Sequence, residues 1–510
     1  MLMINNLKER RMASKSKSSD SGLGEFIVPV IDLLSIAIMK GFEFLGLGIM
    51  WGLNRYVFKR ESKGEIKKIE RGDLKNKRST LDENALGYSL TQKKDLLLQD
   101  FERKKHSAII GASGFGKTVL LDVLMYDDMR KGKPIIYLDP KGDNKSLHQF
   151  INLCRLTARE FSIFSEHYFG YGAIDLNPAK DGSATHIADR IHYSFDWSEE
   201  HYETLCYRAL KTSITTILEM GESIHFGSIL YKVKELCDPK NKEQQFARKD
   251  VDGLIARLEN IIHSDFGDKL TSTGQSIGDI WNNGKCVYIG MPVLGYPKIA
   301  RALGKIILGD LSYAVYKKYS EITIELEKSL TPVGVYIDEL SAFITDEFIE
   351  LLNKCRGVKM ELTFAFQSPS DINKVNPDLC EQILENSSNW FILKQRMEKG
   401  ANLFSDAIGT LEGKKNTVRV KDGEEQGQGS QRKVEELVVH ANLIKNLNSG
   451  QCILLRHGPT RIDLVNIKHI DPEVTESNVR FFEKEGLLDK IQIPKDVKKM
   501  VNIKTKGDAL

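Results

Sequence analysis

The sequence predicts an α/β fold with a mostly parallel central sheet and an inserted all-α subdomain. Three observations support this prediction. First, residues 106–129 read as a short apolar strand, a glycine-rich turn and a helix. Second, apolar runs within 134–145, 285–292 and 333–340 are rich in β-branched and aromatic residues, which is typical of buried strands. Third, the strand signals fade between 185 and 280, where apolar residues recur at helical spacing.

Length and composition bound the class of protein. The 510 residues are enough for about two or three domains. Lys and Arg number 73 against 70 Asp and Glu, and this balance argues against a nucleic-acid-coating surface over the whole protein while leaving a local one open. The seven cysteines are scattered without a CxxC pair. That pattern excludes a zinc ribbon or a disulfide framework and fits a reducing compartment.

The N-terminal part contains the most apolar run, residues 26–53, which Asp32, Lys40 and Glu43 interrupt. A spanning helix needs about 20 mostly apolar residues, and central charges oppose insertion. One tilted span, a hairpin of two half-spans and an interfacial helix stay open, as does a buried helix of a soluble domain. We expect residues 1–60 to form a membrane-associated segment with basic flanks.

A basic stretch follows the apolar run. From Arg55 to Arg78 the sequence holds ten basic and four acidic residues, a composition that attracts anionic lipid on the cytoplasmic face. A solvated, charged linker is the simpler interpretation, and the two are compatible. We expect residues 61–100 to form this basic linker.

The glycine-rich turn matches the phosphate-binding P-loop pattern G-x-x-x-x-G-K-[ST] throughout. Its glycines let successive backbone N–H groups face phosphates at a helix N-terminus. The lysine can reach the β- and γ-phosphates of ATP, and the threonine hydroxyl can bind Mg²⁺. The predicted nucleotide-binding residues here are Gly111, Ala112, Ser113, Gly114, Phe115, Gly116, Lys117 and Thr118.

A second metal ligand is predicted at the end of the strand within 333–340. Asp338 is suited to hold the Mg²⁺ shell as a Walker-B aspartate, and Glu339 to polarise the attacking water. Acidic residues after a strand are also common in turns, so this assignment depends on the P-loop.

A turn rich in Pro, Gly and Asp ends the strand within 134–145. Asp139 and Lys141 are expected at the carboxyl edge of the sheet, where ligands bind in such folds. For Asp143 we favour a structural role in the turn.

The rest of the chain completes the predicted domain organisation. The nucleotide-binding domain is expected over 101–184 and again over 281–470, with the all-α subdomain at 185–280 between the two parts. Residues 411–436 are polar and rich in Gly, Gln and Lys, so we expect a mobile loop there. The charged residues 471–510 are expected to form a peripheral tail.

Taken together, the motifs GASGFGKT, YLDPKGD, CVYIGMP, VYIDEL and CRGVKMELTFAFQSPSD resemble, in this order, those of the type IV secretion coupling proteins of the TraG/TraD group. The resemblance covers about residues 100–460. It implies a RecA-like P-loop ATPase of the FtsK/HerA type, hexameric and tethered to the bacterial inner membrane with its ATPase domain in the cytoplasm. It also implies that relaxase-bound single-stranded DNA, or protein, is received and passed to the secretion channel.

Two residues gain roles from this resemblance. Gln367 lies at the carboxyl end of the strand expected over ELTFAFQ, residues 361–367, and is predicted to orient the attacking water near the γ-phosphate, although a polar strand end is the simpler interpretation. Arg356 precedes the same strand and is predicted to act as an arginine finger on the neighbouring subunit's ATP. A structural salt bridge is the alternative for Arg356.

Three functions remain in competition from the sequence. The first is an ATP-hydrolysing coupling protein that drives the transfer of DNA or protein. The second is a receptor that recruits substrates with little motor activity. The third is a soluble DNA translocase of the HerA/FtsK type, which membrane fractionation would distinguish.

Overall fold

The computed structural model describes residues 67–74 and 84–470, apart from 198, 243, 324–329 and 422–423. The predicted N-terminal segment 1–60 and the C-terminal tail 471–510 lie outside these residues. Among the helices that are described, none combines the length and the apolar composition needed to cross a bilayer.

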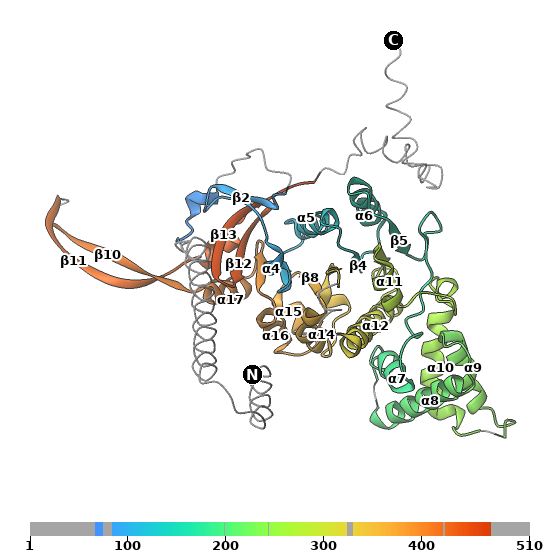
Figure 1. The fold of residues 1–510 in the computed structure, drawn as a ribbon. Coiled ribbons are helices and arrows are strands. Elements are labelled where there is room, and N and C mark those ends of the chain that lie inside the picture. The colour runs from blue at the N-terminus through green and yellow to red at the C-terminus, as the bar shows by residue number, and fades with distance from the viewer. Residues whose placement is uncertain are drawn as a thin grey trace, which may run out of the picture. The chain divides into compact units, whose positions relative to one another are not determined.

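An eleven-stranded sheet is the centre of the described chain (Figure 1). Its order is β2-β1-β13-β12-β9-β3-β8-β7-β4-β6-β5. The strands are β1 (Gly87–Ser89), β2 (Lys94–Leu96), β3 (Ser107–Ile110), β4 (Ile135–Asp139), β5 (Phe161–Phe164), β6 (Cys286–Gly290), β7 (Val333–Ile337), β8 (Met360–Phe366), β9 (Asn389–Ile392), β12 (Gln451–His457) and β13 (Thr460–Ile467).

The sheet has a parallel and an antiparallel part. From β9 through β3, β8, β7, β4 and β6 to β5, every neighbouring pair is parallel. Strands β12, β13, β1 and β2 extend the β9 edge in antiparallel fashion. The predicted α/β fold with a mostly parallel central sheet is therefore confirmed. Because parallel strands are joined by crossovers, their carboxyl ends share one edge of the sheet.

Helices cover both faces of the parallel part, so its strands are buried on both sides. Strand β4 is almost entirely apolar because both of its faces are covered. Ile135 and Tyr137 point to the face covered by α5 (Lys117–Arg130) and α6 (Asn144–Leu156), while Ile136 and Leu138 belong to the core on the other face. That second face is covered by α12 (Ile299–Glu321), α14 (Phe348–Cys355) and α16 (Leu379–Glu385).

A group of helices lies between β5 and β6 in the sequence, in the region predicted to be helical. The helix expected over 201–221 is α8, and the one expected over 251–262 falls within α10. This group consists of α7 (Ala184–His192), α8 (Glu200–Glu219), α9 (Phe226–Leu236), α10 (Arg248–Ile262) and α11 (Ile277–Asn283). The remaining α-helices are α4 (Asp100–Arg103), α15 (Pro369–Ile372), α17 (Glu398–Ile408) and α18 (Ala441–Lys445).

The expectation of a mobile loop over 411–436 is wrong. This segment forms a separate two-stranded antiparallel hairpin of β10 (Thr410–Lys421) and β11 (Glu424–Leu437), which extends away from the main sheet in Figure 1. The register runs from Thr410 opposite Leu437 to Lys421 opposite Glu424. Backbone hydrogen bonds between the two strands suffice for this pairing, so polar side chains do not prevent it.

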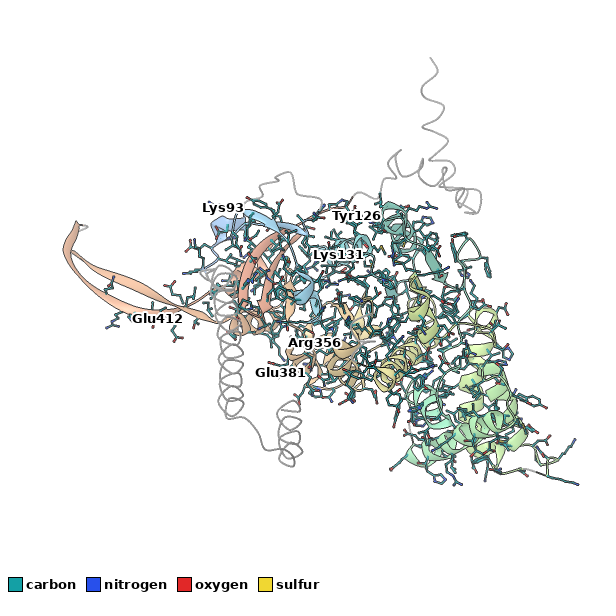
Figure 2. All side chains as sticks on the ribbon, in the orientation of Figure 1. Lys93, Tyr126, Lys131, Arg356, Glu381 and Glu412 are labelled. Carbon is teal, nitrogen blue, oxygen red and sulfur yellow. The ribbon has the colours of Figure 1, made fainter. Side chains whose placement is uncertain are left out.

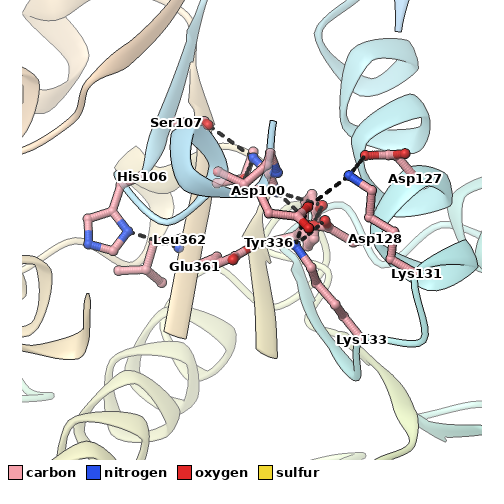
Figure 3. Close-up of polar contacts among 12 residues, drawn as sticks. Asp100, His106, Ser107, Asp127, Asp128, Lys131, Lys133, Tyr336, Glu361 and Leu362 are labelled. Atoms are coloured by element: carbon pink, nitrogen blue, oxygen red, sulfur yellow. Dashed lines mark hydrogen bonds and ion pairs between the residues drawn. The ribbon is translucent and has the colours of Figure 1, made fainter. Parts of the chain in front are cut away.

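Charged side chains are buried at the amino edge of the parallel strands (Figure 3). We call Arg103, Asp128, Lys133, Tyr336 and Glu361 the amino-edge cluster. Asp128 accepts from Arg103 Nη2 at 2.7 Å, from Tyr336 Oη at 2.5 Å and from Lys133 Nζ at 2.9 Å. Lys133 Nζ also donates to Glu361 Oε2 at 2.7 Å. Two cations thus face two carboxylates, and the positive neighbours hold the pKa of Asp128 well below its usual range despite burial.

Candidate nucleotide-binding site

The loop between β3 and α5 has the conformation that its glycines allow. Gly114 and Gly116 take φ values of 84° and 105°, which residues with a side chain rarely adopt. Gly111 instead allows a close approach, because a Cβ there would lie 2.6 Å from Cβ of Leu393 at the end of β9. The neighbouring strand therefore packs directly against the start of the P-loop.

Lys117 begins α5 and is buried beneath this loop. Its Nζ donates to the carbonyl oxygen of Gly111 at 2.7 Å. Burial lowers the pKa of Lys117, and the nearby Glu339 and Asp338 act in the opposite direction. The ammonium group is thereby held against the loop on which phosphates would lie.

The two predicted magnesium ligands are brought together from distant parts of the chain. Thr118 Oγ1 lies 3.2 Å from Oδ2 of Asp338, which directly follows β7. Lys141 Nζ contacts both oxygens, donating to Thr118 Oγ1 at 3.1 Å and forming an ion pair with Asp338.

A hard cation fits this position. The other oxygen of Asp338, Oδ1, is buried and has no hydrogen-bond partner among the described residues. Such an unpaired carboxylate oxygen is costly unless a cation or a donor reaches it. The described residues contain no cluster of three or more His, Cys, Asp or Glu side chains suited to a metal. A Mg²⁺ site usually takes only one or two protein oxygens, which act together with nucleotide phosphates, and Thr118 and Asp338 would supply these.

The carboxyl group of Asp139 lies near these two predicted ligands. Asp139, at the end of β4, accepts from Tyr288 Oη at 2.7 Å and from the backbone N–H of Lys141 at 2.9 Å. Burial, with a contribution from Asp338, raises the pKa of Asp139 to about 6. The sequence predicted that Asp139 lies at this edge of the sheet and contributes to ligand binding. In the structure its carboxylate accepts hydrogen bonds from within the protein and stabilises the turn that carries Lys141.

Asp122 was missed by the sequence reasoning. It lies one helical turn after Thr118 on α5, and burial together with Asp338 raises its pKa to about 7. A cavity of about 430 Å³ opens beside it and is lined in part by Thr118 and Lys141. The spacing of four residues from the P-loop threonine was the available signal.

Glu339 and Gln367 meet at the ends of neighbouring strands. Gln367 Nε2 donates to Glu339 Oε2 at 3.2 Å, and Ser341 Oγ donates to the other oxygen of Glu339 at 2.9 Å. Glu339 has a φ of 56°, an unusual backbone conformation for a residue with a side chain. Such conformations concentrate at functional sites.

Arg356 lies at the opposite edge. It begins a short 3₁₀ helix, Arg356–Val358, before β8, whereas Gln367 directly follows β8. The seven residues of β8 place its two ends, and so Arg356 and Gln367, about 20 Å apart. The Arg356 side chain is exposed (Figure 2) and forms no ion pair within the described part of the chain, so the alternative of a structural salt bridge gains no support here.

Asp143 has the structural role that the sequence favoured. Its carboxylate accepts from the backbone N–H of Ser146 at 2.7 Å and caps the N-terminus of α6.

Comparison with known proteins agrees with this architecture. Residues 332–449 match the sequence-family model described as the TraM recognition site of TraD and TraG, and residues 101–299 match the central domain of helicase HerA. No curated protein sequence matches the chain significantly.

Solved structures of the bacterial conjugative coupling protein TrwB are similar in fold. Its unbound form superposes with a TM-score of 0.57 at 15% identity, covering 79% of this chain and 93% of that one. The complex of the plasmid coupling protein TrwB with ADP and Mg²⁺ gives the same TM-score and identity, with 79% and 94% coverage.

The fold and the site together define a RecA-like P-loop nucleotide-binding protein. Within that class, the chain is similar to the type IV secretion coupling proteins, and the resemblance predicted from its motifs is confirmed.

Proposed function

We propose that this protein is an ATP-hydrolysing coupling protein of a conjugation or type IV secretion system. The observation that carries the proposal is the convergence of Lys117, Thr118, Asp338, Glu339 and Gln367 at one edge of the sheet. We call these residues, with Asp139 and Lys141, the carboxyl-edge site. The similarity to conjugative coupling proteins supports the same function.

The P-loop and the five converging residues each have a task in this proposal. The P-loop backbone from Gly111 to Gly116 and the ammonium of Lys117 hold the β- and γ-phosphates of ATP. Thr118 and Asp338 hold Mg²⁺, which neutralises charge on the phosphates when bound. Glu339 accepts a proton from the attacking water. Gln367 orients both Glu339 and that water through its amide, for which the 3.2 Å contact between the two side chains provides the geometry.

A ring of subunits completes the catalytic machinery. Arg356 is too far from the nucleotide of its own subunit, so we assign it to the ATP of a neighbour in a homo-oligomer, which we expect to be a hexamer. An arginine supplied in this way stabilises transition-state charge and is typically worth about 10³–10⁵ in rate.

The proposed partners follow from the similarity to the coupling proteins. We expect single-stranded DNA to be bound without sequence preference through its backbone. The segment that matches the TraM recognition site indicates relaxosome proteins, including a relaxase, as partners. We place the ATPase domain in the cytoplasm at the bacterial inner membrane, next to the secretion channel.

The direct test is ATP hydrolysis by the purified protein with and without single- or double-stranded DNA. We expect Mg²⁺-dependent hydrolysis that DNA stimulates and that Glu339→Gln abolishes. In a transfer assay, Glu339→Gln should also abolish delivery of the substrate. Delivery that persists in this variant would instead identify a recruiting receptor, and hydrolysis that is absent under every DNA condition would refute the motor.

The role of Arg356 has its own test. Mixed oligomers of Arg356→Ala and Lys117→Ala subunits should recover part of the activity that each variant lacks alone. No recovery in verified mixed oligomers would contradict a role in trans.

A further inference from the structure

The turn that carries Arg356 is fixed on both sides, although the arginine itself is exposed. Arg356 and Gly357 lie in the short 3₁₀ helix before β8, and both are exposed. Cys355 before them and Val358 after them are fully buried. The N–H of Lys359 donates to the carbonyl oxygen of Arg356 at 3.1 Å and closes the turn. The backbone at Arg356 is therefore held in place while its side chain faces solvent.

A buried histidine holds the residue that precedes the turn. Cys355 Sγ lies 3.6 Å from Nε2 of His106, the residue directly before β3. The same Nε2 lies 3.2 Å from the carbonyl oxygen of Leu352 in α14, and Nδ1 accepts from the N–H of Leu362 in β8. The end of α14 is thereby attached to the amino edge of the sheet, and the turn starts from a fixed point.

Gly357 makes a second contact, with a side chain from another part of the chain. A Cβ at this position would lie 1.8 Å from the phenolic oxygen of Tyr319 and 2.6 Å from Cζ of its ring. Non-bonded atoms do not approach so closely, since their optimal separation is about 3.5–4.0 Å. Gly357 does not have the positive φ that favours glycine, so the space taken by Tyr319 is what requires a glycine here.

Tyr319 is held by a rigid element. It lies in the last turn of α12, a helix of 23 residues whose inner face belongs to the core through residues such as Leu311 and Val315. Tyr319 itself is 41% exposed and adds little to that core. Its contact with Gly357 therefore acts on the turn more than on the packing of α12.

We propose that Tyr319 is a positioning residue for Arg356. Its phenol ring blocks the movement of Gly357 toward α12 and so fixes the direction in which Arg356 leaves the surface. An arginine that stabilises transition-state charge on the neighbouring subunit's ATP must be placed in advance, because a displaced donor loses most of its effect. This inference rests on the proposed function of Arg356 and adds to it the residue that acts through it.

Steady-state ATP hydrolysis by the full chain tests this role first. We expect Tyr319→Ala to lower kcat by about 10-fold or more, since misplacing a catalytic group by about 1 Å can cost about 100-fold. The KM for ATP should not change, because the carboxyl-edge site is intact. Tyr319→Phe keeps the ring and should retain most of the native kcat. The matched control is Tyr316→Ala, an exposed tyrosine of α12 that contacts His186 and should leave kcat unchanged.

Two further measurements separate positioning from a merely structural role. In an Arg356→Ala background, Tyr319→Ala should cause no additional loss of kcat, because Tyr319 acts through Arg356. In mixed oligomers, Lys117→Ala subunits should supply an intact Arg356 to Tyr319→Ala subunits, so that hydrolysis per intact P-loop rises. A structural defect would lower kcat in both settings and would lower the temperature of thermal unfolding as well.

Gly357→Ala approaches the same contact from the other side. Its methyl group cannot coexist with the phenol ring of Tyr319, so the turn or the ring must move. We expect a loss of kcat similar to that of Tyr319→Ala, and the double variant should lose less than the product of the two single effects. If Gly357→Ala does not fold, the comparison of Tyr319→Ala with Tyr319→Phe still decides.

Several outcomes would overturn the proposal. A folded, oligomeric Tyr319→Ala protein with native kcat would refute the positioning role and leave the proposed ATP hydrolysis intact. A loss of kcat that is equally large in the Arg356→Ala background would assign Tyr319 to something other than Arg356. An Arg356→Ala protein that hydrolyses ATP as the native protein does would refute both the arginine finger and this inference. A native protein without hydrolysis would contradict the proposed function itself.

Discussion

The two edges of the parallel sheet both bury charged side chains, yet they differ in how well those charges are balanced. In the amino-edge cluster, Arg103 and Lys133 face Asp128 and Glu361. At the carboxyl edge, four carboxyl groups lie near the two cations Lys117 and Lys141, and they belong to Asp122, Asp139, Asp338 and Glu339. Burial and neighbouring carboxylates raise the pKa values of Asp139 and Asp122. One buried carboxylate oxygen has no partner among the described residues at each edge, Oδ1 of Asp338 and Oε1 of Glu361, so the edges differ in the number of carboxylates per cation. Removing one partner from a balanced buried cluster leaves an uncompensated charge and destabilises the fold, whereas an excess of carboxylates indicates a place for a cation.

Arg103→Leu should show the structural character of the amino-edge cluster. The substitution leaves Asp128 buried with one cation fewer, so we expect the free energy of unfolding to fall by about 3–5 kcal/mol. Urea unfolding followed by circular dichroism measures this loss. A second substitution, Asp128→Leu, should restore part of it, because the uncompensated charge is then gone. A loss below about 1 kcal/mol would show that this cluster is not a structural one.

Lys117→Ala should lower activity rather than stability. In the proposed function its ammonium binds the phosphates of ATP, so we expect ATP hydrolysis to fall by at least about 10²–10³-fold. Removing a buried charge with a lowered pKa should leave stability equal or higher. The matched comparison is Lys133→Ala, a buried lysine whose loss should destabilise the fold and leave nucleotide binding by the folded fraction unchanged. Equal effects of both variants on activity and stability would remove the distinction between the edges.

The pH dependence of stability gives a third test, through His106. Its Nδ1 accepts from the N–H of Leu362 at 3.1 Å and its Nε2 faces Leu352 O at 3.2 Å, and burial lowers its pKa to about 4. Between that value and the ordinary 6.5, the unfolded chain binds the proton and the folded one does not. The contribution of His106 is therefore complete above pH 6.5 and is lost as the pH falls toward 4, by about 3 kcal/mol.

His106→Gln isolates this contribution. The difference in unfolding free energy between the native protein and this variant should shrink as the pH falls from 7 to 4, and carboxyl groups that titrate in the same window cancel in the difference. His167→Gln, at an exposed histidine, serves as the control. A difference that does not change with pH would contradict the neutral, buried state of His106.

The smallest effect is expected for Asp143→Ala. Although this carboxylate lies close in sequence to Lys141, it caps α6, so its loss should cost about 1 kcal/mol of stability. The affinity for a fluorescent ATP analogue should not change. A weaker affinity without a loss of stability would place Asp143 among the nucleotide ligands.

Sequence reasoning reached the parallel part of the sheet and most of the carboxyl-edge site because both have local signals. Buried parallel strands are continuous apolar runs, and the P-loop and Asp338-Glu339 follow such runs directly. The amino-edge cluster was out of reach, since Arg103, Asp128 and Glu361 come from three distant segments that only the fold brings together. A glutamate inside the apolar strand β8 was the one hint.

The β10–β11 hairpin was missed for a different reason. Its sequence contains few apolar residues, so the hydrophobic pattern that marks other strands is absent. The sequence did contain Asp422-Gly423 between Lys421 and Glu424, a dipeptide that is strongly favoured in two-residue hairpin turns. Turn chemistry was thus the better guide in this polar segment.

Mg²⁺-dependent binding of a fluorescent ATP analogue tests the contrast between the two edges most directly, when it is compared in the native protein, Asp338→Asn and Glu361→Gln. The two substitutions alter buried carboxylates on or next to the adjacent strands β7 and β8. We predict that Mg²⁺ strengthens binding to the native protein and to folded Glu361→Gln, and that Asp338→Asn loses this dependence. A native protein that binds no nucleotide, or an Asp338→Asn variant that keeps the full effect of Mg²⁺, would contradict the assignment of the carboxyl edge.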